Sequence, residues 1–172
     1  MTACRGKIEA GAEAKRVWMT LLKGGEPAPD FKLPTDRGDT IRLSDVRGKR
    51  VVLFFYPRAD TPGCIKEACG FRDDYETFQE LGVVVLGISP DTVRAQSKFR
   101  DHYSLSYPLL ADADHQVAQA YGVWEDKKMF GVPYKGVVRT TFLIDEQGRI
   151  ARVFEGVNAD GHSQEILAAL KG

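Results

Sequence analysis

The chain has 172 residues, enough for one domain with a full hydrophobic core. Lysine plus arginine and aspartate plus glutamate number 24 each, so the formal net charge is zero and no basic stripe suggests a nucleic-acid partner. Hydrophobic residues make up 43% of the sequence, but no apolar run approaches the roughly 18 residues that span a bilayer, so no membrane association is expected.

Residues 1–23 are expected to form a loosely attached extension ahead of a single domain at residues 24–172. The extension lacks the apolar stretch of a signal peptide, and its acidic residues argue against a transit peptide. The three cysteines, Cys4, Cys64 and Cys69, are too few for a disulfide scaffold. They indicate a reducing compartment, with the cytoplasm as the expected location.

The first half of the domain predicts strands around one long helix. Residues 31–33 and 40–43 are expected to be short strands that pair as a hairpin. Residues 50–56 and 83–89 are near-continuous apolar runs, typical of strands covered on both faces. Residues 61–81 between them have helical periodicity, so this region predicts a β-α-β unit with two parallel strands.

The middle of the chain predicts a polar helix at residues 91–102, a short strand at 107–110, a short helix at 114–121 and a polar, aromatic loop at 124–136. Asp112 and Asp114 are capping candidates for the short helix.

Two strands and a helix are expected to close the domain. The strands, at residues 137–145 and 149–155, are predicted to form a hairpin, and residues 163–171 form the last helix. This order of elements predicts an α/β fold of three layers, with a central mixed sheet and helices on both faces.

Cys64 stands out by its position in the helix that follows the first buried strand. Thr61 is a good N-cap and Pro62 suits the first helical position, so Cys64 falls within the first turn. It begins a core-facing stripe that continues at Ala68, Phe71, Tyr75 and Phe78. The thiol should be mostly buried at the carboxyl edge of the sheet, where ligands bind in α/β folds. The alternative interpretation is a small buried core residue.

A buried thiol needs a nearby cation to act as a nucleophile. An ordinary thiol has a pKa near 8.5, and making it mostly thiolate at neutral pH requires roughly 3 kcal/mol. A helix N-terminus supplies about 0.3–1 kcal/mol, and at most about 2 kcal/mol, while burial acts in the opposite direction. Arg139, which directly precedes an apolar strand segment, is the preferred candidate, because a buried arginine is costly unless it is paired.

Cys69 follows Cys64 by five residues in the same predicted helix. Five helical steps rotate the side chain by about 140° and separate the Cα atoms by roughly 8–9 Å. A disulfide requires Cα atoms within about 7 Å, so the first turns must unwind before the two cysteines can bond. The spacing alone leaves two interpretations of Cys69 open, an inert thiol on the polar flank or a redox partner.

No metal or cofactor site is indicated. The histidines His102, His115 and His162 lack ligand spacing, and surface or capping roles are expected for them. Gly63 and Gly161 belong to no phosphate-binding motif.

The segment at residues 56–73 closely resembles the active-site segment of peroxiredoxins of the peroxiredoxin Q, or bacterioferritin comigratory protein, subfamily. It contains Pro57, Thr61 and Cys64 in the pattern Pro-x-x-x-Thr-x-x-Cys, with a second cysteine five residues later. Residues 121–131 and 139–145 also look like signatures of this subfamily. The resemblance covers about residues 24–170 and implies a thioredoxin-like fold.

The resemblance also implies a role for each site residue. Cys64 would be the peroxidatic cysteine, which attacks hydrogen peroxide or an organic hydroperoxide and becomes a sulfenic acid. Thr61 would hydrogen-bond the thiolate and the peroxide, Pro57 would shield the site from water, and Arg139 would stabilise the thiolate. Cys69 would be the resolving cysteine, and a thioredoxin-type dithiol would reduce the resulting intramolecular disulfide.

Three further expectations follow from the resemblance. Glu67 matches a position that helps to hold the arginine, and the subfamily favours a monomer without a cofactor. Two alternatives remain, a peroxide sensor without efficient turnover and a one-cysteine peroxidase that does not use Cys69. Cys4 lies outside the family pattern and is either inert or a competing resolving partner.

Overall fold

The computed structural model describes residues 21–171 and places the expected elements in the expected order. The strands are β1 Lys32–Pro34, β2 Thr40–Arg42, β3 Arg50–Phe55, β4 Val83–Ser89, β5 Leu109–Ala111, β6 Trp124–Met129, β7 Val132–Val137, β8 Thr140–Ile144 and β9 Ile150–Phe154. The helices are the short η1 Leu43–Val46, α2 Pro62–Asp73, α3 Tyr75–Glu80, α4 Val93–Tyr103, α5 Gln116–Ala120 and α6 His162–Lys171. Cys4 and nearly all of the expected extension lie outside the described residues.

A mixed five-stranded sheet forms the centre, in the order β5-β4-β3-β8-β9. Strand β3 pairs with β4 in parallel, as the β-α-β prediction requires, and with β8 in antiparallel orientation. The side chains of β3 are almost completely buried on both faces, which explains the continuous apolar run at this position. The predicted fold class, α/β with a central mixed sheet, is confirmed.

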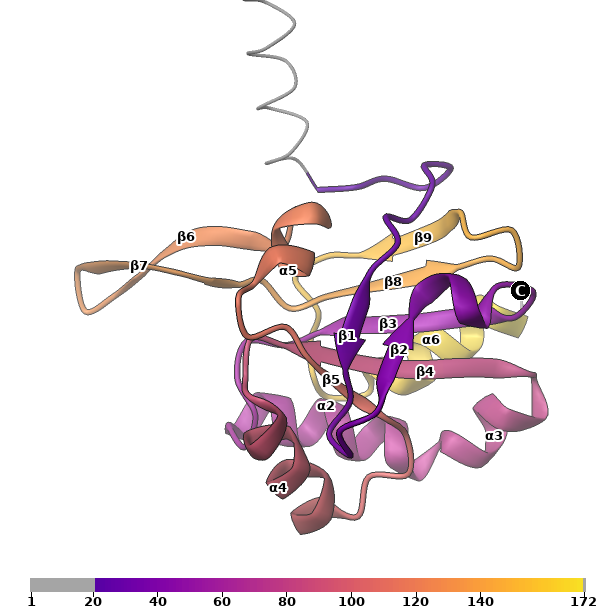
Figure 1. The fold of residues 1–172 in the computed structure, drawn as a ribbon, viewed down its shortest axis with the longest axis horizontal. Coiled ribbons are helices and arrows are strands. Elements are labelled where there is room, and N and C mark those ends of the chain that lie inside the picture. The colour runs from indigo at the N-terminus through magenta and orange to yellow at the C-terminus, as the bar shows by residue number, and fades with distance from the viewer. Residues whose placement is uncertain (1–20, 172) are drawn as a thin grey trace, which may run out of the picture.

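The two faces of the sheet are covered by different layers (Figure 1). Val52 and Phe54 of β3 point to one face, where they pack with residues of α2, α3, α4 and α6. Leu53 and Phe55 point to the other face, which is covered by the β1–β2 hairpin, η1 and α5. Since α2 begins just beyond the end of β3, its first turn lies at the carboxyl edge of the sheet. Within residues 21–171, none of the helices has the length and apolar character needed to cross a membrane.

One predicted loop is wrong. Residues 124–136 contain the antiparallel pair β6 and β7, which projects from the body of the protein (Figure 1). The turn between them consists of Phe130 and Gly131, whose φ angles of 52° and 78° are those of a tight hairpin turn. The hairpin is hard to foresee because its strands are largely exposed and lack alternation of apolar residues, and because phenylalanine is unusual at a positive φ angle. Val137 consequently ends β7, and the next strand begins only at Thr140.

The single helix expected at residues 61–81 is interrupted at Asp74. The carboxylate of Asp74 accepts hydrogen bonds from Ser163 (2.6 Å) and Gln164 (2.8 Å) at the start of α6. Gly70 lets α6 approach α2 closely, because a Cβ atom at this position would lie 3.2 Å from the Ser163 hydroxyl. The break is therefore a tertiary effect that helical periodicity does not report.

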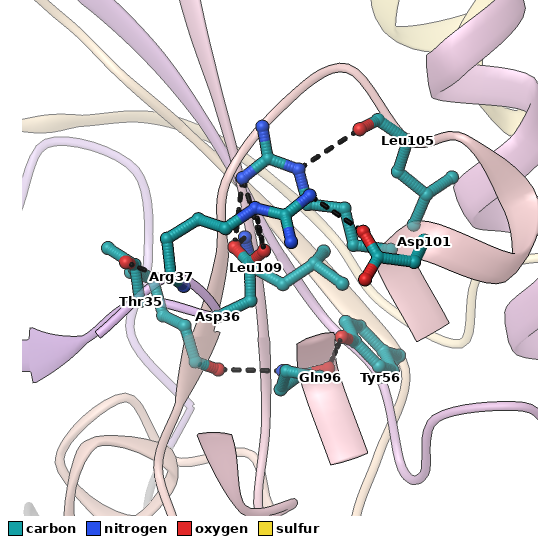
Figure 2. Close-up of polar contacts among 10 residues, drawn as sticks. Thr35, Asp36, Arg37, Tyr56, Gln96, Asp101, Leu105 and Leu109 are labelled. Carbon is teal, nitrogen blue, oxygen red and sulfur yellow. Dashed lines mark hydrogen bonds and ion pairs between the residues drawn. The ribbon is translucent and has the colours of Figure 1, made fainter. Parts of the chain in front are cut away.

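A buried ion pair fastens the β1–β2 hairpin to the helical layer (Figure 2). The Asp36 carboxylate is fully buried and accepts hydrogen bonds from Arg100 of α4 (3.0 Å) and from the backbone amide of Leu109 (3.1 Å). Arg37 lies alongside it and pairs with the exposed Asp101. The partners compensate for the cost of burying the carboxylate, so this cluster holds segments that are distant in the sequence.

Candidate active site

The site is built on a short loop between β3 and α2. Tyr56 continues β3 by one residue and donates its backbone amide to Ile88 of β4 (3.0 Å). The chain then turns through Pro57 and through Asp60, which adopts a left-handed φ angle of 64°. Thr61 is the N-cap residue and Pro62 is the first helical residue, as predicted.

Side-chain hydrogen bonds hold the loop between β3 and α2 in place. The Tyr56 hydroxyl donates a hydrogen bond to the side-chain amide of Gln96, which itself donates to the Leu110 carbonyl (2.8 Å), as Figure 2 shows in part. The Asp91 carboxylate accepts hydrogen bonds from the Ala59 amide (2.7 Å) and the Ser89 hydroxyl (2.6 Å). The loop that delivers the chain to α2 is therefore attached to β4, α4 and β5.

Cys64 lies in the first turn of α2 and is only 1% exposed. Its sulfur is 3.3 Å from Nη2 of Arg139, which reaches the site from the segment between β7 and β8. Gly63 makes this approach possible, because a Cβ atom there would lie 3.0 Å from the same nitrogen. The thiol thus meets both a helix N-terminus and a guanidinium, which are the two features that favour its thiolate form. The pairing of Cys64 with Arg139 agrees with the prediction.

Glu67 completes the constellation from the next turn of α2. Its carboxylate is fully buried and accepts a hydrogen bond from Nη1 of Arg139 (2.9 Å). Burial raises the pKa of Glu67 to about 7, although Arg139 acts in the opposite direction. Burial also disfavours the charge on Arg139, but Glu67 and Cys64 outweigh it, so the pKa of Arg139 lies above its ordinary value. The guanidinium therefore stays charged and is held in one orientation by Glu67.

The raised pKa of Glu67 predicts a measurable dependence of stability on pH. Folding favours the protonated carboxyl, so the free energy of unfolding should fall as the pH rises from 4.5, the ordinary pKa, to about 7. The loss amounts to at most about 3 kcal/mol, because one pKa unit corresponds to about 1.4 kcal/mol. The Glu67→Gln variant lacks this titrating carboxyl, so its free energy of unfolding should not show this fall. Chemical denaturation should therefore find the variant more stable relative to the parent protein at pH 8 than at pH 5.

A suitable control is Glu80→Gln, which changes an exposed glutamate at the end of α3. Its stability should follow that of the parent protein at both pH values. A constant difference between Glu67→Gln and the parent protein across this range would contradict the assignment.

Thr61 and Pro57, in the loop that leads into α2, are half-buried. The Thr61 hydroxyl donates a hydrogen bond to the Arg58 carbonyl (2.9 Å), and the Thr61 carbonyl accepts one from the Ile65 amide (2.8 Å). Thr61 therefore begins the helix with its backbone, while its hydroxyl oxygen keeps lone pairs that can accept a further hydrogen bond.

Cys69 lies five residues beyond Cys64 in the unbroken helix α2, and both cysteines are free thiols. Cys69 is half-buried, and burial raises the pKa of its thiol, with the nearby Arg72 acting in the opposite direction. Cys69 therefore remains a protonated thiol at neutral pH. Because α2 is folded and five helical steps separate the two residues, their side chains point from different sides of the helix.

Two residues near the site depart from the sequence interpretation. His162 is buried, contrary to the surface or capping role expected, and lies 2.8 Å from the Thr141 hydroxyl. Lys127 of β6 donates a hydrogen bond to the Val137 carbonyl, and burial, followed by the proximity of Arg139, lowers its pKa. The sequence gives no signal for Lys127, because its position depends on the β6–β7 hairpin. Among residues 21–171, no cluster of histidine, cysteine and carboxylate side chains could hold a metal ion.

Comparison with known proteins identifies the family. The profile of the AhpC/TSA family matches residues 24–153, which is most of the chain and includes Cys64, Cys69 and Arg139. The chain belongs to the AhpC/TSA family. Within it, this peroxiredoxin belongs to the peroxiredoxin Q, or Bcp, subfamily, as its relatives show.

Among its relatives, the putative peroxiredoxin Bcp of Coxiella burnetii is 53% identical over 149 residues, which cover 87% of this chain and 99% of that protein. Peroxiredoxin Bcp of Bacillus subtilis is 46% identical over 147 residues, covering 86% and 94% of the two chains. The predicted resemblance to the peroxiredoxin Q subfamily is confirmed.

Solved structures agree with the fold. The peroxidoxin BcpB of Mycobacterium tuberculosis superposes with a TM-score of 0.78 at 42% identity, covering 87% of this chain and 97% of that one. The bacterioferritin comigratory protein of Xanthomonas campestris, described for its alkyl peroxide reduction activity, has a TM-score of 0.81 at 30% identity and covers 86% and 97%. The fold is therefore the thioredoxin-like peroxiredoxin fold, and the protein is a thiol-dependent peroxidase that acts on peroxides.

Proposed function

We propose that this peroxidase reduces hydrogen peroxide and organic hydroperoxides with Cys64 as the peroxidatic cysteine and Cys69 as the resolving cysteine. The observation that carries the proposal is the 3.3 Å contact between the Cys64 sulfur and the Arg139 guanidinium at the N-terminus of α2. Cys69, in contrast, lies away from this pair and has a raised pKa. The two thiols therefore have environments suited to different steps.

In the first step, the Cys64 thiolate attacks the terminal oxygen of the hydroperoxide. A sulfur–oxygen bond forms, the oxygen–oxygen bond breaks, and the leaving alkoxide or hydroxide takes up a proton to become an alcohol or water. The products are a sulfenic acid on Cys64 and the alcohol, so sulfur is oxidised by two electrons. We infer that the Arg139 guanidinium donates hydrogen bonds to the charge that develops on the transferring oxygens. The Thr61 oxygen would accept a hydrogen bond from the protonated oxygen of the hydroperoxide, and Pro57 would limit access of water.

In the second step, the Cys69 thiol attacks the Cys64 sulfenic sulfur, and a disulfide and one water molecule are formed. Helical geometry keeps the Cα atoms roughly 8–9 Å apart, beyond the reach of a disulfide, so α2 must unwind locally first. A thioredoxin-type protein then supplies two electrons as a dithiol and restores both thiols. The pair lies within one chain, which supports a monomer as the working unit.

The remaining proposals concern location and domain boundaries. Residues 24–172 carry the activity, and residues 1–23 form an extension that the mechanism does not use. The cycle requires a supply of reduced dithiol, which supports the cytoplasm as the compartment.

The resolving role of Cys69 is tested by Cys69→Ser. After one equivalent of peroxide, mass spectrometry of the parent protein should find an intrachain disulfide between Cys64 and Cys69. The variant should form the sulfenic acid at the parent rate, because the side-chain hydrogen bonds of Arg139 among the described residues go to Glu67 and Cys64 and not to Cys69. It should, however, lose most of its turnover with thioredoxin. Cys4→Ser serves as the control and should retain both the link and the turnover.

Other outcomes favour the alternatives. A persistent sulfenic acid in the parent protein, with turnover that is unchanged in Cys69→Ser, would indicate a one-cysteine peroxidase. A disulfide between Cys64 and Cys4 would assign the resolving role to Cys4. A disulfide that forms normally but is not reduced by thioredoxin would favour a sensor or a different reductant.

A further inference from the structure

The residues between the two cysteines make an unusual contact outside their own helix. The hydroxyl of Tyr107 donates a hydrogen bond of 2.6 Å to the backbone carbonyl of Ala68, which lies between Cys64 and Cys69. Tyr107 is fully buried just before β5, where its ring packs against Phe54 and Tyr75. A helical carbonyl already accepts an amide hydrogen bond from four residues ahead, so Tyr107 occupies the second lone pair.

Neighbouring contacts hold the same part of α2. The Arg72 guanidinium, one turn beyond Ala68, donates a 2.7 Å hydrogen bond to the Tyr103 carbonyl at the end of α4. Ser163 of α6 donates to Asp74, at the break that follows α2. The second half of the helix is therefore tied to α4, to the segment before β5 and to α6. Between the cysteines, Arg139 holds the Glu67 side chain, and Tyr107 holds the backbone through the Ala68 carbonyl.

This position matters because the disulfide requires that segment to rearrange. Residues 64–69 must leave helical geometry before the two sulfurs can meet, and the peptide group of Ala68 and Cys69 turns with them. Burial raises the pKa of Tyr107 well above its ordinary value, so its hydroxyl remains a donor. When Ala68 moves away, this buried hydroxyl loses its hydrogen-bond partner, which disfavours the unwound state.

We propose that Tyr107 is a positioning residue that sets how long the Cys64 sulfenic acid persists, by holding the helix folded through the Ala68 carbonyl. The proposal rests on the proposed resolving role of Cys69. A longer-lived sulfenic acid is exposed to a second peroxide, which transfers another oxygen to the sulfur and gives a sulfinic acid and an alcohol. Tyr107 would thus set the balance between disulfide formation and over-oxidation, without a part in the first reaction.

The test separates these steps in Tyr107→Phe. Rapid acid quenching and mass spectrometry should show sulfenic acid formation at the parent rate. Disulfide formation should be about two- to tenfold faster, the range that corresponds to the loss of one typical buried hydrogen bond. At high peroxide concentration, the sulfinic fraction should fall by a similar factor. Amide hydrogen exchange at residues 64–69 should be faster in the reduced variant, which reports on the helix independently of the chemistry.

Tyr121→Phe is the matched control. Tyr121 is also fully buried and donates its hydroxyl to a backbone carbonyl, that of Pro29 (2.8 Å), but it lies on the opposite face of the sheet from α2. Its loss should leave disulfide formation unchanged. An unchanged or slower disulfide step in Tyr107→Phe, or an equal acceleration in Tyr121→Phe, would overturn the proposal. Turnover with thioredoxin is measured in parallel in the parent protein and in Cys69→Ser; turnover that is unchanged in Cys69→Ser refutes the proposed function, whatever Tyr107 does.

Discussion

Cys64→Ser should consume no peroxide above the buffer blank in the presence of thioredoxin, its reductase and NADPH. Serine matches cysteine in shape, but its hydroxyl ionises far less readily and its oxygen is a much poorer nucleophile than a polarisable thiolate. The contact between residue 64 and the Arg139 guanidinium can remain, yet no group at that position can accept the transferred oxygen. The measurement is NADPH oxidation at 340 nm combined with direct determination of the remaining peroxide.

Controls exclude loss of fold as the cause. Thermal unfolding of Cys64→Ser should resemble that of the parent protein within the cost of burying one hydroxyl, about 1–3 kcal/mol. Cys4→Ser should keep its activity. Turnover that persists in Cys64→Ser would mean that another group reacts with peroxide, and the proposed assignment of the peroxidatic cysteine would have to be abandoned.

Arg139→Met should slow the reaction of Cys64 with peroxide by about 10²–10³-fold, the usual effect of removing one preorganised donor to developing charge. The guanidinium is within 3.3 Å of the sulfur, and it offers the nearest positive charge shown by the described contacts. Stopped-flow measurement of sulfenic acid formation by the parent protein and by the variant would report this effect.

Removing Arg139 also leaves the Glu67 carboxylate buried without its partner, so stability must be separated from chemistry. The double variant Arg139→Met with Glu67→Gln should regain stability but not rate. Arg100→Met is a matched control, because the Arg100 side chain is 19% exposed against 17% for Arg139 and is also paired with a fully buried carboxylate, Asp36. A comparable loss of rate in Arg100→Met would show that the effect of Arg139 is a general loss of structure.

Much of the fold follows from local patterns in the sequence. The run at β3 is apolar because both of its faces are covered, and the stripe from Cys64 through Phe71 to Phe78 marks the buried face of the helical segment. The Asp112 carboxylate accepts hydrogen bonds from the amides of Val117 and Ala118 in the first turn of α5, although the N-cap residue of this helix is His115. These features depend on neighbours within a few residues or on simple burial, so they are visible in the sequence alone.

Features that depend on tertiary contacts are harder to predict from the sequence. The break at Asp74 depends on Ser163, almost ninety residues away, and the burial of His162 depends on Thr141 and on aromatic neighbours. The same holds for the active site, where only part of the geometry can be predicted from the sequence. Energetics required a cation near Cys64 and position suggested Arg139, but the fixation of Ala68 by Tyr107 could not be inferred, because it joins α2 to a residue just before β5.

The projecting β6–β7 hairpin is a place where substitutions can change the activity of this enzyme at little cost in stability. Its tip residue Phe130 is 99% exposed, and its strands contribute little to either apolar cluster, so substitutions there should cost little stability. Yet β7 ends at Val137, only two residues before Arg139. Changes in an otherwise tolerant surface ribbon can therefore move the guanidinium and alter the reactivity of Cys64. Natural variation or directed evolution in the hairpin thus offers a way to tune the peroxidase rate while every residue of the active site is kept.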